Sequence, residues 1–436
     1  MGNYFGTDGI RGIAGKFLNA ELAFKLGQSL KAVLNTEKLV IGQDTRLSGD
    51  MLASSVAAGA MSAGINVERV GVVSTPMLAY YAKQENVDAV MITASHNPYH
   101  DNGLKLFKRG EKILEKEEIM IETHIDAPLK TETNAIGTES FSNCVDETYQ
   151  GMYHAMDLEH VNMSVGLDCA NGATYQIAKA IIGPLVDECK VIHNMPDGLN
   201  INLDCGSTHL EAIQAHVIEH KLDLGISFDG DGDRALVVDH QGKIIDGDLI
   251  IYALAKYFKT TNELTKNTVV LTKMSNPGIV KALKELGIKT VRTDVGDKYV
   301  SQEMRRGGYI LGGENSGHII MNTFMHTGDG ILVAVMLLQM LQKLRIPLSK
   351  VIEAVDMYPQ KMVNVKAVDK AVLEDKKVKA VIKEAEKTLG SDALLLVRAS
   401  GTEPLIRVTI SHRDEALLDR VMDLIVESIK KGGETI

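Results

Sequence analysis

The sequence predicts an α/β protein of three mixed-sheet α/β domains followed by a smaller C-terminal α+β domain. The chain has 436 residues, and at about 150 residues per domain this length indicates three domains, or four if one is small. Helix-like and strand-like segments alternate through the first third of the chain, which is typical of parallel α/β layers. The last ~75 residues instead carry two strands and one helix, enough for a small α+β unit.

The first domain is expected over residues 1–152. Behind a cap at Asn19, helical spacing of four apolar residues predicts a helix: Leu22, Leu26, Leu30 and Val33. Three short apolar strands follow, and each leads into a polar loop: 39–41, 70–73 and 89–92. Ligands of open α/β sheets bind at the carboxyl ends of the strands. The loop after the third strand, Thr93-Ala94-Ser95-His96-Asn97-Pro98, is therefore where we expect chemistry.

Three further domains are expected over residues 153–248, 249–358 and 359–436, with Tyr358-Pro359-Gln360 as a linker. The second should contain strands at 164–167 and 222–228. The third should contain an apolar helix at 249–258, a strand at 268–271 and another apolar helix from Ile331. The fourth should contain strands at 393–397 and 406–410 and a helix at 415–429.

Composition describes a folded, soluble chain and excludes two classes of protein. Hydrophobic residues make up 45% and charged residues 24%, close to globular averages. The net charge of −10 argues against a nucleic-acid binder that needs a basic face. The longest apolar run, Ile331 to Leu338, is far shorter than the roughly 18 residues of a membrane span. We therefore expect neither nucleic acid nor a membrane as a partner. Because the net charge is negative, any anionic ligand would have to be bound by a local patch of positive charge.

The N-terminal segment and the cysteines favour a cytoplasmic protein. The segment MGNYFGTDGIRG has no basic and apolar leader pattern, and Gly6 breaks the myristoylation pattern. The four cysteines show no CxxC spacing and are expected to be reduced thiols: Cys144, Cys169, Cys189 and Cys205.

Three aspartates at alternate positions predict a metal site: Asp229, Asp231 and Asp233. Alternate residues of an extended segment face the same side, so the three carboxylates can converge, and oxygen ligands of this kind suit Mg²⁺. A calcium-binding EF-hand would need Gly and Glu where Arg234 and His240 stand. A dinucleotide-binding loop is excluded because the aspartates would repel a pyrophosphate and a strand follows instead of a helix.

Ser95 is the candidate nucleophile. No GxSxG elbow surrounds it, and adjacency alone does not make His96 its base, so a serine hydrolase is disfavoured. With an acidic metal site elsewhere in the chain, phosphoserine chemistry is the better hypothesis, since a metal can bridge a seryl phosphate and carboxylates.

Two further loops have the residue types of a sugar-phosphate site. Arginines, hydroxyls and a glycine turn near the C-terminus suit a phosphate monoester: Arg398, Ser400, Gly401, Thr402 and Arg407. A glycine-rich loop offers acceptors and donors for sugar hydroxyls: Glu314, Asn315, Ser316 and His318.

Over nearly its whole length the chain resembles the α-D-phosphohexomutases. The motifs occur in the family's order: YFGTDGIRG, TASHNP, DCANGAT, PDGLNIN, CGSTH, FDGDGDR, TKMSNPG, VGDKYV, GGENSGH, TGDG and RASGTEPLIRV. The start, DCANGAT and the PDGLNIN and CGSTH pair are similar to the glucosamine branch. The resemblance implies a heart-shaped enzyme of four domains around a central cleft, which interconverts the 6- and 1-phosphates of glucosamine, a step toward UDP-N-acetylglucosamine.

The resemblance also implies residue roles and cofactors. Ser95 would carry a phosphoryl group and bind one Mg²⁺ together with the three aspartates, and a hexosamine 1,6-bisphosphate would be intermediate and activator. Arg11 and Lys105 would lie beside the transferring group, and Arg234 and His318 would complete the site. Glu314 and Ser316 would bind the sugar, and the residues near the C-terminus its distal phosphate: Arg398, Ser400, Gly401, Thr402 and Arg407.

Three points stay open at this stage. Lys105 can act as an acid or base if cationic neighbours and burial lower its pKa. Glucose or mannose phosphates are alternative substrates, and a catalytically silent sugar-phosphate sensor is an alternative from another class. A homodimer is the candidate assembly.

Overall fold

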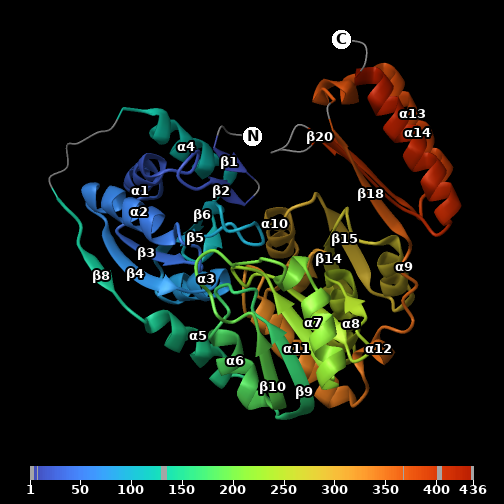
Figure 1. Ribbon diagram of the computed structural model, residues 1–436, viewed down its shortest axis with the longest axis horizontal. Coiled ribbons are helices and arrows are strands. Elements are labelled where there is room, and N and C mark those ends of the chain that lie inside the picture. Colours follow the sequence, from blue (N-terminus) through green and yellow to red (C-terminus); the bar gives the residue numbers. More distant parts are fainter. Residues whose placement is uncertain (1–3, 7, 129–134, 367, 400–404, 434–436) are drawn as a thin grey trace.

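The computed structural model describes residues 4–6, 8–128, 135–366, 368–399 and 405–433, which form four sheets with their helices (Figure 1). The first three sheets mix parallel and antiparallel pairs, and the fourth is wholly antiparallel. The predicted class, three mixed α/β units and a small α+β unit, is confirmed.

The first sheet has eight strands in the order β1-β2-β6-β5-β3-β4-β8, with β7 paired to β6. Helix α1 begins where the Asn19 side chain accepts a hydrogen bond from the Leu22 N–H, as the sequence predicted, and ends at Asn35 in the left-handed conformation. The elements are β1 Phe5–Gly6, β2 Gly9–Ile13, α1 Ala20–Leu34, β3 Lys38–Gln43, α2 Gly49–Ser62, β4 Asn66–Val72, α3 Thr75–Gln84, β5 Asp88–Ile92, β6 Asp101–Lys108, β7 Glu111–Lys112, α4 Glu115–Asp126, β8 Glu139–Phe141 and α5 Cys144–His154.

The second and third sheets share one plan, in which a strand with two parallel neighbours is followed by an antiparallel extension. Their orders are β10-β9-β11-β12-β13 and β15-β14-β16-β17. The second unit comprises β9 Val161–Asp168, α6 Ile177–Ile182, the 3₁₀ turn η1 Gly183–Leu185, β10 Val186–Ile192, η2 Gly206–Thr208, α7 Glu211–His220, β11 Leu224–Phe228, β12 Ala235–Asp239 and β13 Ile244–Ile245. The third comprises α8 Gly247–Thr260, η3 Thr265–Asn267, β14 Thr268–Thr272, α9 Pro277–Glu285, β15 Lys289–Thr293, α10 Asp297–Gly307, β16 Leu311–Gly313, β17 Ile319–Met321, α11 Gly330–Leu344 and α12 Leu348–Val351.

The C-terminal unit is a three-stranded sheet, β18-β20-β19, covered by two long helices (Figure 1). Its elements are β18 Gln360–Lys366, η4 Lys370–Glu374, α13 Lys376–Leu389, β19 Leu394–Ala399, β20 Leu405–Ser411 and α14 Glu415–Gly433. The predicted linker overlaps the start of β18, because Gln360 is the first residue of that strand. The Asn276 side chain bonds both the N–H and the carbonyl of Tyr358.

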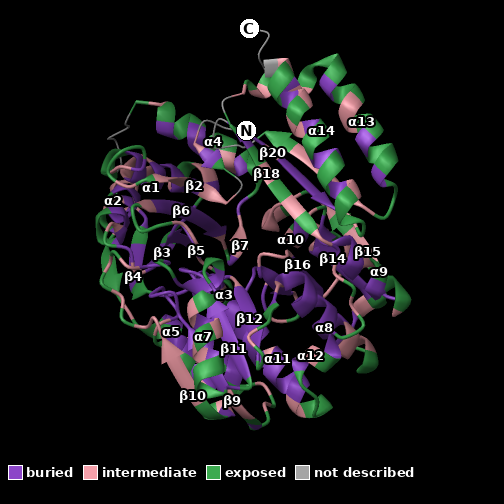
Figure 2. Cartoon of the chain, turned by 45° about the vertical axis from the view of Figure 1, so that its right-hand side comes forward, coloured by how far each residue is buried: buried purple, intermediate pink, exposed green. Residues whose placement is uncertain are grey.

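The buried residues show how these units are joined (Figure 2). One apolar cluster runs from Val40 of β3 through the second sheet to Ile352, so it spans parts of the first three units. The C-terminal unit has a core of its own, from Val365 to Ile429. The last unit is therefore held to the others mainly through its linker, while the first three pack as one body.

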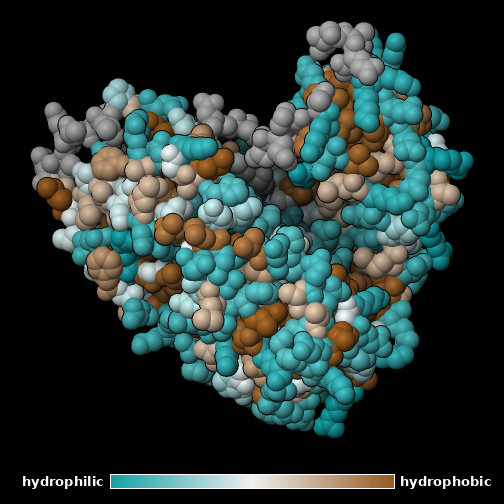
Figure 3. Space-filling model, viewed as in Figure 1, coloured by the Kyte–Doolittle hydropathy of each residue, from teal (hydrophilic) through white to brown (hydrophobic). Residues whose placement is uncertain are grey.

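The space-filling view has a heart-shaped outline, with a deep notch between the first unit and the C-terminal unit (Figure 3). This confirms the predicted shape. Within the described part of the chain, no helix is both long and apolar enough to cross a membrane.

Candidate active site

The Ser95 loop follows β5 at the carboxyl end of that parallel strand. Ser95 is 1% exposed and has a φ of 54°, a left-handed conformation that is uncommon for residues other than glycine and often marks a functional position. Its N–H donates to Thr93 Oγ1 at 2.9 Å, and its hydroxyl donates to Asp229 Oδ2 at 2.5 Å. The candidate nucleophile thus faces the candidate metal loop.

The three aspartates occupy the turn between β11 and β12. Asp229, Asp231 and Asp233 are buried, and one oxygen from each lies within 4.8 Å of the others. The Oδ1 atoms of Asp231 and Asp233 are buried without a hydrogen-bond partner. Unpaired carboxylate oxygens that converge in a buried site are the donor set a hard cation requires, so these residues fit Mg²⁺.

The acids of this turn differ in their ionisation. Burial, Asp233 and Asp231 raise the pKa of Asp229 well above its usual range. Burial also opposes ionisation of Asp233, but the charges of Lys105 and His318 hold its pKa well below the usual value. The positive charges of Lys105 and His318 therefore compensate Asp233 more than they compensate Asp229.

Lys105 lies within the acidic cluster, on the antiparallel strand β6. Its ammonium is 2.7 Å from Asp231, 3.1 Å from Asp233 and 2.9 Å from Asp8. Burial lowers the pKa of Lys105, but the three carboxylates outweigh it and hold the pKa well above the usual value. The condition under which Lys105 would act as an acid or base, a lowered pKa, is therefore not met among these neighbours, because they are mainly acidic.

Arg11 and Lys105 share Asp8 as a partner, and Asp8 is a residue that the sequence analysis missed. Asp8 accepts hydrogen bonds from both Arg11 and Lys112, and Lys112 also bonds Asp297. Burial opposes ionisation of Asp8, yet Lys105, Lys112 and Arg11 hold its pKa well below the usual value. Asp8 lies three residues before Arg11 in the motif YFGTDGIRG. This closeness to a predicted site residue was the signal in the sequence that could have identified Asp8.

His318 connects the metal loop to the third unit. Its Nδ1 is 3.5 Å from Asp233 and its Nε2 is 3.5 Å from Asp297. The Gly328 N–H donates to Nε2 at 3.1 Å, so Nε2 is an acceptor and the ring proton is assigned to Nδ1, facing Asp233. Burial lowers the pKa of His318, but Asp233 outweighs it and the net pKa is raised.

Arg234 and the loop between β16 and β17 continue the site. The Arg234 N–H donates to Asp229 Oδ1 at 3.2 Å, and its side chain lies 3.8 Å from Asp233. Glu314 accepts from the Gly296 N–H at 3.0 Å. The hydroxyl of Ser316 is buried without a hydrogen-bond partner within the described part of the chain.

Arg398 and Arg407 stand opposite each other on β19 and β20. The Arg407 Nε donates to Asn364 at 3.1 Å. Burial and the charge of Arg407 lower the pKa of Arg398, as expected for two neighbouring cations that a dianion would stabilise. The other predicted phosphate ligands, Ser400, Gly401 and Thr402, lie outside the described residues.

The structure therefore joins most predicted site residues in one network of hydrogen bonds and ion pairs. Two others lie on the C-terminal unit. The network contains Ser95, Arg11, Lys105, Asp229, Asp231, Asp233, Arg234 and His318, with Glu314 and Ser316 in the adjoining loop. Arg398 and Arg407 belong to the C-terminal unit.

A second group of metal-type ligands, Asp168, His193 and Cys205, has another explanation. Their ligand atoms also lie within 4.8 Å of one another. The Asp168 carboxylate already accepts from the Ala170 and Gly206 N–H groups and lies 3.0 Å from His193 Nδ1. Asp168 thus closes loops of the second unit. All four cysteines are free thiols, as expected.

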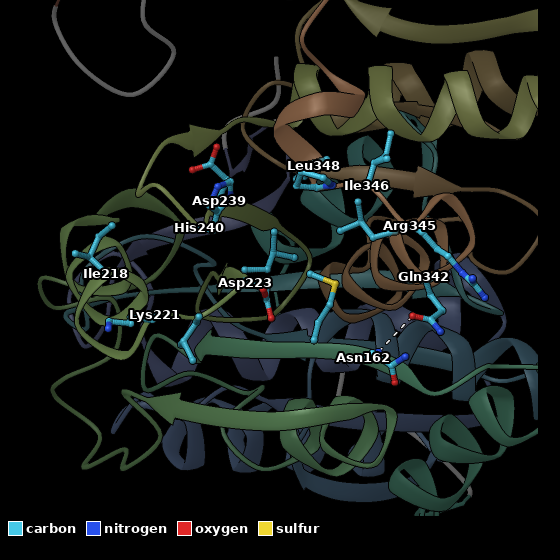
Figure 4. A pocket seen from close by; sticks show the side chains of 15 residues that line it. Asn162, Ile218, Lys221, Asp223, Asp239, His240, Gln342, Arg345, Ile346 and Leu348 are labelled. Atoms are coloured by element: carbon cyan, nitrogen blue, oxygen red, sulfur yellow. Dashed lines mark hydrogen bonds between the residues drawn. The ribbon is translucent and has the colours of Figure 1, made fainter.

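A cavity of about 850 Å³ lies away from this network, between the end of α11 and the strands of the second unit (Figure 4). It sits near Asn162 and Leu224, at the amino ends of β9 and β11, whereas the aspartate turn follows the carboxyl end of β11. Its lining holds two basic and two acidic side chains, Lys221, Arg345, Asp223 and Asp239. This charge balance does not suit a phosphate site.

Comparisons with known proteins agree with this geometry. Four descriptions of the phosphoglucomutase/phosphomannomutase family match in order: alpha/beta/alpha domain I at residues 2–132, domain II at 146–242, domain III at 246–358 and the C-terminal domain at 362–428. The chain is 44% identical to the phosphoglucosamine mutases of Bacillus licheniformis and Bacillus subtilis, over 99% of each chain.

Solved structures share the fold. A phosphoglucomutase/phosphomannomutase family protein from Burkholderia thailandensis aligns with a TM-score of 0.82 at 23% identity, covering 98% of this chain and 97% of its own. Aspergillus fumigatus N-acetylphosphoglucosamine mutase, solved with GlcNAc-6P and magnesium, aligns with a TM-score of 0.71 at 17% identity, covering 99% and 96%.

Proposed function

The chain belongs to the phosphoglucomutase/phosphomannomutase family, and from this premise we propose that it is a phosphoglucosamine mutase. It interconverts glucosamine 6-phosphate and glucosamine 1-phosphate through phosphorylated Ser95. The observation that carries the proposal is the 2.5 Å hydrogen bond between Ser95 and Asp229, which joins the hydroxyl loop of one unit to the acidic turn of another.

Each half-reaction exchanges one phosphate ester for another. The P–O bond to Ser95 breaks, a P–O bond to a sugar hydroxyl forms, and the proton of that hydroxyl ends on Ser95 Oγ. The resulting 1,6-bisphosphate turns over in the cleft, and its other phosphoryl group returns to Ser95. The net result is an isomerisation without hydrolysis.

Charge compensation decides whether the bisphosphate can form. Two phosphate dianions about 6 Å apart, at an effective dielectric near 20, repel each other by roughly 10 kcal/mol. Arg11, Lys105 and Arg234 supply positive charge at the serine end. Arg398 and Arg407 are suited to bind the distal phosphate, since they form a cationic pair on neighbouring strands.

Asp229, Asp231 and Asp233 would hold one Mg²⁺ together with the phosphate on Ser95. When bound, the cation neutralises charge that develops on the transferring phosphoryl group. Lys105, with its raised pKa, is proposed to remain an ammonium that donates hydrogen bonds to the same group. Glu314 and Ser316 are proposed to orient the sugar hydroxyls.

The proposal includes a sugar phosphate as partner, a cytoplasmic location and a homodimer. The product feeds the formation of UDP-N-acetylglucosamine.

A coupled assay tests the proposed substrate. The kcat/KM for glucosamine 6-phosphate, measured beside glucose and mannose phosphates, is expected to be the highest of the three. A preference for glucose or mannose phosphate would assign the chain to another branch of the family. Absence of turnover with all three by the phosphorylated, magnesium-supplied protein would favour the silent sensor.

A further inference from the structure

The serine loop is held by two backbone carbonyls that each accept two side-chain hydrogen bonds. These are the carbonyls of Ser95 and Asn97, and both bond the same two residues, Arg46 and Asn202. Neither donor belongs to the set of residues assigned above to phosphate, metal or sugar. We call Arg46 and Asn202 the carbonyl clamp.

Arg46 is the clamp donor from the first unit. Its side chain is fully buried and paired with Asp44, and its Nη2 donates to Ser95 O at 3.1 Å and to Asn97 O at 2.5 Å. The Asp44 carboxylate also accepts from the Thr93 hydroxyl at 2.6 Å, and Thr93 in turn accepts from the Ser95 N–H. This buried ion pair therefore fixes both the start and the centre of the loop.

Asn202 is the clamp donor from the second unit, in the PDGLNIN motif. Its Nδ2 donates to Ser95 O at 2.9 Å and to Asn97 O at 3.0 Å. Its own N–H bonds Ala170 O at 2.9 Å, which ties it to the DCANGAT motif. The same boundary is crossed by the Thr45 hydroxyl, which donates to Asn171 O at 2.6 Å.

The aspartate turn packs against the carbonyl of Ser95. A Cβ added to Gly230 would lie 2.5 Å from Ser95 O and 2.8 Å from Asn202 Nδ2. Ser95 O, Asn202 and the backbone between Asp229 and Asp231 are thus in direct contact. Any shift of this carbonyl changes where the Ser95 hydroxyl lies relative to Asp229.

The clamp also explains how Ser95 keeps its left-handed backbone. A conformation with φ near 54° costs free energy for serine, and it persists only where surrounding contacts hold it. Four hydrogen bonds to two carbonyls supply such contacts.

We propose that Asn202, acting with Arg46, is a positioning residue for phosphoryl transfer: it aligns Ser95 with the aspartate turn across the boundary between two units. This inference rests on the proposed transfer through Ser95. Misplacement of a reacting group by about 1 Å costs about 100-fold in rate, so loss of one clamp donor should lower kcat without affecting sugar binding.

The test compares Asn202→Gly with Asn200→Ala in the full-length, magnesium-loaded phosphoenzyme. Glycine adopts the left-handed φ of 57° at position 202, so the substitution removes the amide without forcing the backbone. Asn200 is in the same motif, and its side-chain bonds among the described residues are to Met195 and Asp197 of its own loop. We expect kcat to fall 10- to 100-fold in Asn202→Gly and to stay within twofold in Asn200→Ala.

Three further readings make the result decisive. The Kd of glucosamine 6-phosphate, measured by calorimetry on dephosphorylated protein, should be unchanged in Asn202→Gly. Asn202→Asp, which turns a carboxylate toward two carbonyl oxygens, should lose at least as much kcat. A wild-type kcat in Asn202→Gly, or a loss of kcat matched by equal weakening of sugar binding and a lowered Tm, would overturn the inference. Ser95→Ala, run in parallel, separates this failure from that of the proposed function, because an active Ser95→Ala would refute Ser95 chemistry itself.

Discussion

The chemistry of single residues here depends on partners far away in the chain. Ser95 meets Asp229 across 134 positions, and Lys105 meets Asp231 across 126. The short motifs therefore predicted which residues carry function, since each motif holds its own characteristic side chains. They did not predict the state of Lys105, because burial and three carboxylates from other segments decide its pKa.

Residues that only support the motifs were missed for the same reason. Asn202 lies 107 positions from Ser95, and nothing in its local sequence indicates that its amide meets the serine loop. Arg46 is a loop arginine in the sequence and a buried ion-pair partner in the structure. Asp8 and Lys112 were detectable only through nearness to Arg11 and Lys105.

The aspartate turn leads to a prediction at this scale. Chelation of divalent metal should reduce mutase activity to background, since the clustered carboxylates and a seryl phosphate would then repel one another. Addition of Mg²⁺ should restore the activity. Activity that is indifferent to chelator, with metal content checked by elemental analysis, would remove the metal role from these three aspartates.

Among the elements, helices and strands with strong apolar patterns were the best predicted. The helix expected at 249–258 is α8, Gly247–Thr260, and the strand expected at 164–167 is β9, Val161–Asp168. Strand β6 was not identified, although it carries Lys105, because its sequence DNGLKLFK starts with polar residues that are buried only after the sheet forms. Sheet order and register could not be predicted from the sequence either, because both depend on contacts between segments that lie far apart in the chain.

The first turn of α8 leads to a second prediction. Burial, with a smaller contribution from Asp246, raises the pKa of Asp248 to about 7. A carboxyl group that binds its proton more tightly when folded loses stabilisation as pH rises from about 4 to about 7, and the penalty is complete above that range. Each tenfold difference in proton affinity between the folded and unfolded chain is worth about 1.4 kcal/mol, so the total is on the order of a few kcal/mol.

Urea unfolding at several pH values checks this penalty. Asp248→Asn keeps an acceptor for the Asn276 N–H, which bonds Asp248 at 2.7 Å, and cannot ionise. We expect its stability advantage over wild type to grow between pH 5 and pH 8. An advantage that stays constant across this range would contradict a raised Asp248 pKa.

At the scale of the whole molecule, a notch separates the Ser95 part of the site from Arg398 and Arg407. The C-terminal unit that carries these two arginines has a core of its own. The first three units share a core, while the C-terminal unit is joined at Tyr358 and by an exposed ion pair between Arg413 and Asp356. Such a connection permits the unit to move as a body. Under the proposed mechanism, movement of this kind would give a bisphosphate room to turn.

Small-angle scattering tests this arrangement with glucose 1,6-bisphosphate as the probe. The radius of gyration should fall when the probe binds, because Arg398 and Arg407 are drawn toward the other end of the cleft.

The Arg407→Ala substitution should weaken binding of the same bisphosphate about 10- to 100-fold, as expected for a hydrogen bond to a charged group worth about 1.5–3 kcal/mol. Lys361→Ala is the matched control, since Lys361 is engaged by Asp419 and Glu415 of its own unit. An unchanged radius at saturation, or equal weakening in both variants, would count against this closure.

The most direct measurement follows a labelled phosphoryl group on Ser95 during a single turnover. Phosphoenzyme carrying the label is mixed with unlabelled glucosamine 6-phosphate, and the reaction is stopped at successive times. We predict that the label leaves the protein, appears in a sugar bisphosphate and is then found in the sugar monophosphates. Formation of glucosamine 1-phosphate while the label stays on the protein would contradict transfer through Ser95.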